Sequence, residues 1–233
     1  MSEAIIHDYP ELIPEEYLER AEKLSSANLC DGMIGLGIPS NGCMRADICA
    51  IDPSMKAVGT ACTVKTAGGD NLPIHLCLYT APEGYVMVID GEKDEGHAYF
   101  GDNMMTTGKV IGLKGMIVDG YVRDYEGCME LQFPVFARGL MPCGPKKELP
   151  GELNGTISCG DIKVEPGDLV VADCDGIAVV PRARIVEVLD KAEVKAGYDD
   201  NRKVVLEKYA EAKKNGDPLP DIAPKWFHEK FEK

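Results

Sequence analysis

Two short segments of this chain carry residue types that could act on an anionic molecule. Gly101 to Met104 has the composition of a helix start, and Arg123 and Asp124 follow a buried apolar run, Met116 to Val118. The first amides of a helix have no partner within the helix and can hold a carboxylate or phosphate. An arginine can bind a carboxylate through two hydrogen bonds, and an aspartate can supply an oxygen ligand to a magnesium-type ion. The two segments therefore predict a site for an anionic substrate and a hard metal ion.

The spacing of the two segments indicates that they meet in space. Asp102 and Arg123 are separated by residues 103–122, a stretch about as long as a helix plus a strand. Ligands of open α/β sheets gather at the carboxyl ends of strands, so two turns separated in this way can share one edge of a sheet. Taken singly, Asp102 also fits a helix N-cap and Arg123–Asp124 a local ion pair.

The other polar candidates are predicted to be structural. His75 lies in an apolar helical stretch and is expected to pack in the core or at an interface, whereas His97 lies in a polar loop and is expected to be exposed. Lys146 and Lys147 are interpreted as surface charge. The chain has no phosphate-binding loop, no nucleophile elbow and no His-Glu-x-x-His motif, so these motif-based classes lose support.

Composition narrows the functional class. The net charge is −14 in 233 residues, which argues against nucleic acid because phosphate binding needs a basic surface. No apolar run reaches the roughly 18 residues that a membrane span needs, and the N-terminus lacks the pattern of a signal peptide. The nine cysteines include no Cys-x-x-Cys pair, so we expect small buried side chains in a reducing cytoplasm.

Hydrophobic patterning predicts an α/β protein with one core and a C-terminal extension. Strands are expected at 57–66 and 85–90, around Met116, and among the turn signals between 156 and 180. Helices are expected at 14–29, 72–79 and 102–111, and just after Asp124. A long helix is expected at 181–214, with an interruption near Gly197. The stretch around Pro224 and Trp226 is expected to be a tail or an arm onto a neighbour.

Six ordered segments resemble the RraA-like family, which includes 4-hydroxy-4-methyl-2-oxoglutarate aldolases and the regulator of ribonuclease activity A. The resemblance runs from about Leu24 to Pro181. The matching segments are Cys30–Gly32, Gly69–His75, Val86–Asp90, Gly115–Asp124, Phe133–Gly139 and Pro166–Pro181.

The resemblance implies a swivelling β/β/α sandwich domain, residues 1–181 with the N-terminal helix, and a helical extension, residues 182–233. It also implies a homotrimer or homohexamer with sites between subunits. Arg123 is implied to bind substrate and Asp124 a divalent metal such as Mg²⁺ or Mn²⁺. The amides of the Gly101–Met104 segment, which includes Asn103, would hold a pyruvate carboxylate, and Asp102 would orient a catalytic water.

The implied function is a metal-dependent aldolase that cleaves a 4-hydroxy-2-oxo acid to pyruvate, with oxaloacetate decarboxylation as a side activity. The aldolases usually carry an acid three residues after the metal aspartate, where this chain has Gly127 preceded by Glu126. A shift of one residue turns a helical side chain by roughly 100°. The distal part of the substrate is therefore open, and two alternatives stand: a protein-binding regulator of ribonuclease activity, or a related 2-oxo acid lyase or decarboxylase.

Overall fold

A computed structural model describes residues 4–231 of the chain. The chain divides into two compact units, residues 1–192 and residues 193–233. The first unit holds the sheet and every residue discussed above as a candidate for chemistry. The domain boundary that the sequence analysis places after Pro181 stays a prediction.

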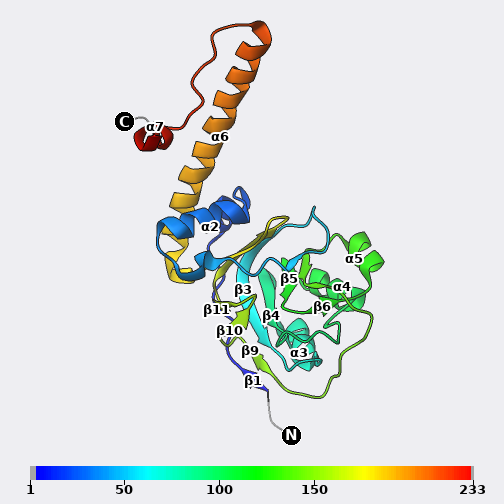
Figure 1. Ribbon diagram of the computed structural model, residues 1–233. Coiled ribbons are helices and arrows are strands. Elements are labelled where there is room, and N and C mark those ends of the chain that lie inside the picture. Colours follow the sequence, from blue (N-terminus) through cyan, green and yellow to red (C-terminus); the bar gives the residue numbers. More distant parts are fainter. Residues whose placement is uncertain (1–3, 232–233) are drawn as a thin grey trace. The chain divides into compact units, whose positions relative to one another are not determined.

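The first unit is built on a mixed sheet whose centre is parallel (Figure 1). Four parallel strands follow one another in space: β3 (Ala57–Lys65), β4 (Tyr85–Asp90), β5 (Gly115–Val118) and β7 (Val135–Ala137). Antiparallel partners flank them: β2 (Cys49–Ala50) on β7, and β9 (Glu152–Leu153) and β12 (Leu169–Asp173) on β3. The sheet is completed by β13 (Gly176–Val180) on β12 and β1 (Ile5–Ile6) on β9. Two small sheets pair β6 (Tyr121–Val122) with β8 (Gly139–Leu140), and β10 (Ile157–Cys159) with β11 (Ile162–Val164).

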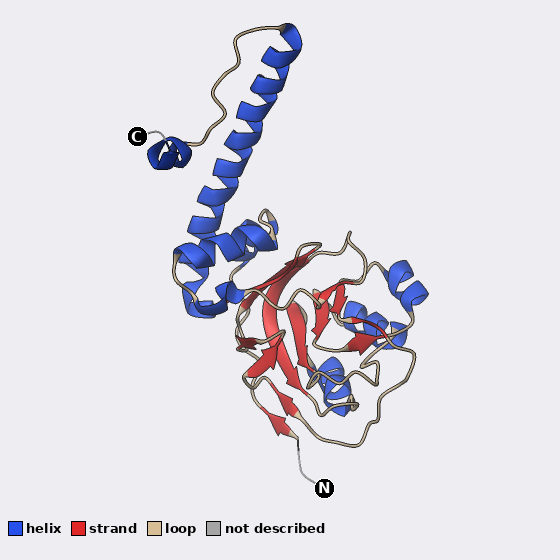
Figure 2. Cartoon of the chain, in the orientation of Figure 1, coloured by secondary structure: helices blue, strands red, loops and turns tan. Residues whose placement is uncertain are grey.

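Figure 2 distinguishes the strands from the helices. The helices are α1 (Glu15–Glu22), α2 (Ser26–Gly35), α3 (Leu72–Thr80), α4 (Asp102–Val110), α5 (Tyr125–Leu131), α6 (Ile185–Asn215) and α7 (Lys225–Phe231), with single 3₁₀ turns at Pro39–Gly42 and Arg182–Arg184. Helices α3, α4 and α5 lie together on one side of the strands, and α2 packs on β12 and β13. The expected α/β class is confirmed. Among the residues that the structure describes, no helix is both long and apolar enough to cross a membrane.

The central strands are buried because helices or strands cover both of their faces. Val86, Met87, Val88 and Ile89 of β4 are fully buried, which explains why this segment is continuously apolar instead of alternating. The rigid centre fixes the loops that leave the carboxyl ends of β3, β4, β5 and β7. These loops form the site described below.

Two expectations about the elements were wrong. The helix expected over 14–29 is two helices, because Ser25 starts α2: its hydroxyl accepts from the Asn28 amide, and the Asn28 side chain accepts from the Ser25 amide. The long helix α6 is continuous through Gly197, where an ion pair of 2.7 Å between Lys195 and Asp199 spans the glycine. The stretch after Pro224 contains the short helix α7, and its role as a tail or as an arm onto a neighbour stays a prediction.

The cysteines were also predicted only in part. Cys62, Cys77, Cys128 and Cys159 are buried as expected. Cys30 is half-buried, and the other four are exposed because they lie in surface turns or at strand edges.

Candidate functional site

A pocket of about 220 Å³ opens where the loops after the four parallel strands converge. Its lining comes from the ends of all four strands: Asn71 and His75 after β3; Tyr99, Phe100, Gly101, Asp102, Asn103 and Met104 after β4; Arg123 and Asp124 after β5; and Gly144, Pro145 and Lys147 after β7 and β8. All six predicted site residues therefore lie in one pocket. This is the edge of a parallel sheet at which α/β proteins bind their ligands.

Backbone hydrogen bonds bring the two predicted segments together. The Tyr99 amide donates to the Tyr121 carbonyl over 2.8 Å, and the Arg123 amide donates to the Phe100 carbonyl over 3.1 Å. This short parallel pairing places Gly101 directly against Arg123 and Asp124. A Cβ atom at position 101 would collide with Asp124 Oδ2 and lie 2.9 Å from Arg123 Cγ. Any side chain at position 101 would therefore displace the Asp124 carboxylate and the Arg123 side chain.

Asp124 adopts a backbone conformation that few residues tolerate. Its φ and ψ of 62° and 48° are left-handed, although it directly precedes α5. Such conformations cost about 1–3 kcal/mol for residues other than glycine and gather at functional sites. The Asp124 side chain does not cap α5; its Oδ2 atom instead lies 3.3 Å from Arg123 Nε. The Asp124 side chain thus lies at the pocket, 41% exposed, beside an Arg123 side chain that is 46% exposed.

The start of α4 already holds a carboxylate oxygen. The Asn103 amide donates to Asp102 Oδ1 over 2.6 Å, and the Met104 amide donates to the Gly101 carbonyl over 3.1 Å. The expectation that these amides are unpartnered was therefore wrong, because the first turn of α4 satisfies them locally. An incoming carboxylate at Asn103 would have to replace the Asp102 side chain.

Gly127 makes room for Asp102 in this arrangement. A Cβ atom at position 127 would lie 2.8 Å from Asp102 Cβ and 3.0 Å from Asp102 Oδ2. Any larger residue would have to push Asp102 or α5 aside. Glycine at position 127, where the aldolases usually carry an acid, therefore leaves the space that the Asp102 side chain occupies.

The donor set of the pocket suits a hard divalent cation. Carboxylates are the protein ligands that Mg²⁺ prefers, and the ion usually keeps several waters and takes only one or two protein oxygens. Asp124 supplies such an oxygen at the mouth of an open pocket, with Asp102 on the adjacent turn. Asp124 is the residue that would hold the ion, and the roles of all six residues remain predictions.

Seven lining residues were not predicted as functional: Asn71, His75, Tyr99, Phe100, Gly144, Pro145 and Lys147. His75 was expected to be a packing or interface residue, yet it reaches the pocket, and Lys147 borders the pocket as well as the solvent. The spacing of Asn71 and His75, four residues apart at the start of a helix that follows a strand, was the available signal. His97 was expected to be exposed; it is half-buried, its Nδ1 lies 3.0 Å from Asp94 Oδ2, and it does not line the pocket.

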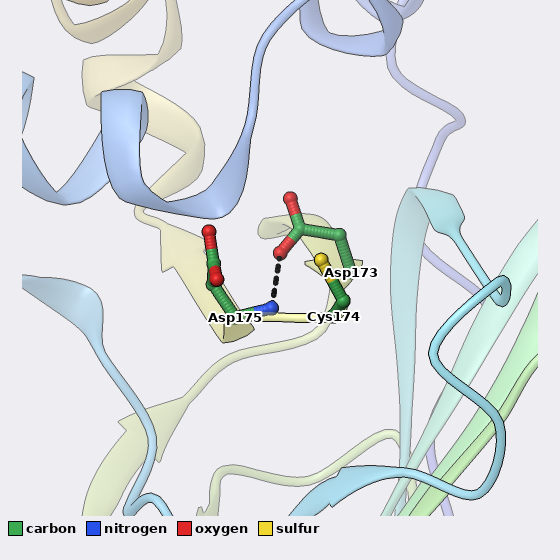
Figure 3. Close-up of side chains that lie close together, drawn as sticks. All are labelled: Asp173, Cys174 and Asp175. Carbon is green, nitrogen blue, oxygen red and sulfur yellow. Dashed lines mark hydrogen bonds between the residues drawn. The ribbon is translucent and has the colours of Figure 1, made fainter.

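A second group of potential metal ligands lies on the turn between β12 and β13. The ligand atoms of Asp173, Cys174 and Asp175 all lie within 4.8 Å of one another (Figure 3). The Asp173 carboxylate, however, accepts hydrogen bonds from the Ser26 amide at 2.8 Å, the Ser26 hydroxyl at 2.6 Å and the Asp175 amide at 3.1 Å. Asp173 therefore ties α2 to the hairpin, and we interpret the group as structural.

Fold and site together define an α/β protein with a small polar pocket at the carboxyl edge of a parallel sheet. The chain belongs to the RraA-like family, whose model, described as Aldolase/RraA, matches residues 26–179.

A protein of Halalkalibacterium halodurans, named "Putative 4-hydroxy-4-methyl-2-oxoglutarate aldolase", is 38% identical over 159 residues, which are 68% of this chain and 76% of that protein. Two solved structures share the fold, each 26% identical in sequence. RraAS2 of Streptomyces coelicolor, described as an unusual member of the RNase ES inhibitor RraA family, has a TM-score of 0.74 and covers 82% of this chain and 98% of its own. An uncharacterized protein of Pseudomonas syringae has a TM-score of 0.72 and covers 90% of this chain and 98% of its own.

Proposed function

We propose that this chain is a divalent-metal-dependent carbon–carbon lyase that cleaves a 4-hydroxy-2-oxo acid, such as 4-hydroxy-4-methyl-2-oxoglutarate, and releases pyruvate. The observation that carries the proposal is the convergence of Arg123, Asp124 and the start of α4 in one pocket. The names of the aldolase-like relatives support the same reaction class.

Substrate binding would begin at the start of α4. The C1 carboxylate of the substrate takes the place of Asp102 Oδ1 at the Asn103 amide, where a carboxylate oxygen already sits at 2.6 Å. The positive end of the helix stabilises a carboxylate at this amide, whether it belongs to Asp102 or to the substrate. The Asp102 side chain, released from the amide, is then free to orient a water molecule in the pocket.

Bond cleavage would depend on the charges around the 2-oxo group. Asp124 would hold a divalent cation, which would supply the Lewis acidity that polarises this group and lowers the pKa of nearby water. Asp102 orients the water that accepts the C4 hydroxyl proton; the C3–C4 bond breaks as a carbonyl forms at C4. The Arg123 guanidinium stabilises the negative charge on the enolate oxygen, and the water returns the proton it accepted to C3, which gives pyruvate. Loss of carbon dioxide from oxaloacetate passes through the same enolate, so we expect that side activity too.

The test is pyruvate release from 4-hydroxy-4-methyl-2-oxoglutarate and from oxaloacetate, coupled to lactate dehydrogenase. Rates should rise with Mg²⁺ or Mn²⁺, fall to the uncatalysed background with EDTA, and return when metal is added back. Equal rates with metal and with EDTA would refute metal dependence.

The competing hypothesis is a non-catalytic regulator that binds a ribonuclease, and the description of RraAS2 supports it. A pull-down against purified ribonuclease, run beside the pyruvate assay, separates the two. A related 2-oxo acid lyase or decarboxylase would release pyruvate or carbon dioxide from a different distal group. A trimer or hexamer in the cytoplasm, with sites between subunits, also remains a proposal, which sedimentation analysis and cell fractionation can test.

A further inference from the structure

Two pairs of cysteines bring their side chains together in this fold, and neither pair takes part in the proposed chemistry. Cys62 on β3 contacts Cys77 on α3, and Cys30 on α2 contacts Cys43, which follows the 3₁₀ turn at Pro39–Gly42. All four are free thiols. A sulfenic acid condenses with a neighbouring thiol to give a disulfide, so either pair has the partner that this reaction needs.

The pair between β3 and α3 is closed to solvent. Cys62 is 0% exposed and Cys77 is 1% exposed, and the Tyr9 hydroxyl lies 3.7 Å from Cys77 Sγ. Structural thiols buried in this way are inert toward oxidants in solution. This pair is therefore an internal reference for the other pair.

The pair on α2 is open to solvent. Cys43 is exposed, and Cys30 is half-buried beside it. Burial, and secondarily the contact with Cys43, raise the pKa of Cys30 above its ordinary value, so Cys30 stays a protonated thiol at neutral pH. An oxidant in solution therefore reaches Cys43 first and finds Cys30 as a second thiol next to it.

The backbone around Cys43 is held between α2 and the hairpin of β12 and β13. Cys43 forms an isolated β-bridge with Ala178 of β13. On the other side, a Cβ atom at Gly42 would lie 2.6 Å from Met33 Sδ, and Met33 follows Cys30 by three residues on α2. Residues three apart are neighbours on a helix surface. The fold thus places the two cysteines side by side before any oxidation.

The other exposed cysteines lie beside oxygen atoms. Cys49 Sγ is 3.9 Å from the Ala137 carbonyl oxygen, Cys143 Sγ is 3.8 Å from the Gly144 carbonyl oxygen, and Cys174 lies near two carboxylates. The same oxidant can reach these three thiols, but their described neighbours offer no sulfur for an intramolecular disulfide. Exposure alone therefore does not distinguish Cys43 from them.

We propose that Cys30 and Cys43 form a reversible disulfide when the chain meets a hydroperoxide, and that this bond stabilises the fold. The Cys43 sulfur attacks the peroxide, the O–O bond breaks, and the departing oxygen takes the Cys43 proton, which leaves a sulfenic acid and releases water or an alcohol. The Cys30 sulfur then attacks the Cys43 sulfur, the S–O bond breaks, and the leaving hydroxide takes the Cys30 proton to give water. Two thiols have then given two electrons to one peroxide, and a dithiol reductant reverses the change.

The bond would close the loop from residue 30 to residue 43 and tie the middle of α2 to the segment that pairs with β13. A cross-link of this length restricts the unfolded chain, so Tm should rise by roughly 5–10 °C on oxidation. The inference does not depend on the proposed function, because neither cysteine lines the pocket.

The experiment treats the full chain with hydrogen peroxide, unfolds it, alkylates the remaining thiols and maps them by mass spectrometry. Trypsin cleaves after Lys23 and Arg45, so Cys30 and Cys43 fall in one peptide that holds no other cysteine. This peptide should resist alkylation and be lighter than its reduced form by the mass of two hydrogen atoms, and dithiothreitol should restore both thiols. Cys62 and Cys77 should remain fully alkylated.

Cys30→Ser is the decisive variant and Cys143→Ser its matched control. Cys30→Ser should leave Cys43 as a sulfenic acid that dimedone traps, with no rise of Tm on oxidation, whereas Cys143→Ser should form the disulfide like the wild type. The redox pair is overturned if wild-type Cys43 reaches the sulfinic acid while Cys30 is still alkylated, or if Cys62 and Cys77 are lost as fast. A disulfide that leaves Tm unchanged would overturn its stabilising role.

Discussion

Two carboxylates in this protein, those of Asp173 and Asp124, could each be interpreted as metal ligands, but their surroundings differ. Asp173 has Cys174 and Asp175 close enough to share a metal ion, yet it is 9% exposed and accepts three hydrogen bonds from its surroundings. Asp124 has fewer potential ligands nearby, but its side chain is 41% exposed and its charged partner is Arg123. The Asp173 carboxylate already has its hydrogen-bond partners, whereas the Asp124 carboxylate can still bind a cation.

The contrast shows that proximity of ligand atoms does not make a metal site. A carboxylate whose oxygens accept hydrogen bonds from backbone and hydroxyl groups stabilises the fold in its ionised form, and a cation would have to replace those bonds. Backbone strain also favours a functional role for Asp124, since this residue holds a left-handed conformation with no capping bond to α5. The predictions below test whether binding and stability separate between the two residues.

The largest effect is expected from Asp124→Asn. This substitution keeps the shape of the side chain but removes the charge that would hold the cation, so kcat/KM for pyruvate release should fall about 10²–10³-fold or more. The free energy of unfolding should change little, because the side chain makes no capping bond. Steady-state kinetics and urea denaturation measure the two quantities. Activity within threefold of wild type would remove Asp124 from the mechanism.

Gly101→Ala should cost about 10–100-fold in kcat/KM, because the new methyl group displaces the Asp124 carboxylate and the Arg123 side chain. The matched control is Gly96→Ala, where the nearest atom to a new Cβ would be 3.9 Å away and no functional residue is touched. The measurement is kcat/KM of both variants under saturating Mg²⁺. If the two variants behave alike, close packing at Gly101 has no bearing on activity.

These two positions also show what local sequence can reveal. The strand, turn and helix pattern around Met116 and Arg123 is local, so the pocket residues from 101 to 104 and from 123 to 124 could be identified before the structure was known. The carboxyl edge of β4 and β5 follows from their continuous apolar runs. That much of the fold and of the site depends on residues close together in the chain.

The rest of the site depends on contacts between distant segments. Lys147 reaches the pocket only because Asp70 and Asn71 hold the loop at 146–149, more than seventy residues away along the chain. His75 looks like a core residue in sequence because its neighbours are apolar, and only the placement of α3 shows which face meets the pocket. The bond from the Asn103 amide to Asp102 depends on a side-chain rotamer, which no pattern specifies.

A moderate effect on stability is expected from Asp173→Asn. The change weakens the hydrogen bonds that α2 makes through Ser26, so the free energy of unfolding should fall by about 1.5–3 kcal/mol, the usual contribution of hydrogen bonds to a charged group. kcat/KM should stay within twofold of wild type, because Asp173 does not line the pocket. Urea denaturation and the pyruvate assay give both numbers. A loss of activity without a loss of stability would reverse the assignments of Asp173 and Asp124.

The smallest effect is expected from Asp175→Asn, which tests the second group as a metal site most directly. Asp175 is exposed, and the bond it makes to Asp173 comes from its backbone amide, which the substitution leaves in place. The free energy of unfolding should therefore change by less than about 0.5 kcal/mol. Calorimetric titration with Mn²⁺ should give the same stoichiometry and affinity as wild type, whereas Asp124→Asn should remove binding. If Asp175→Asn abolishes a binding event that Asp124→Asn leaves intact, the turn between β12 and β13 holds a cation of its own, and hydrogen bonding at Asp173 does not preclude metal binding.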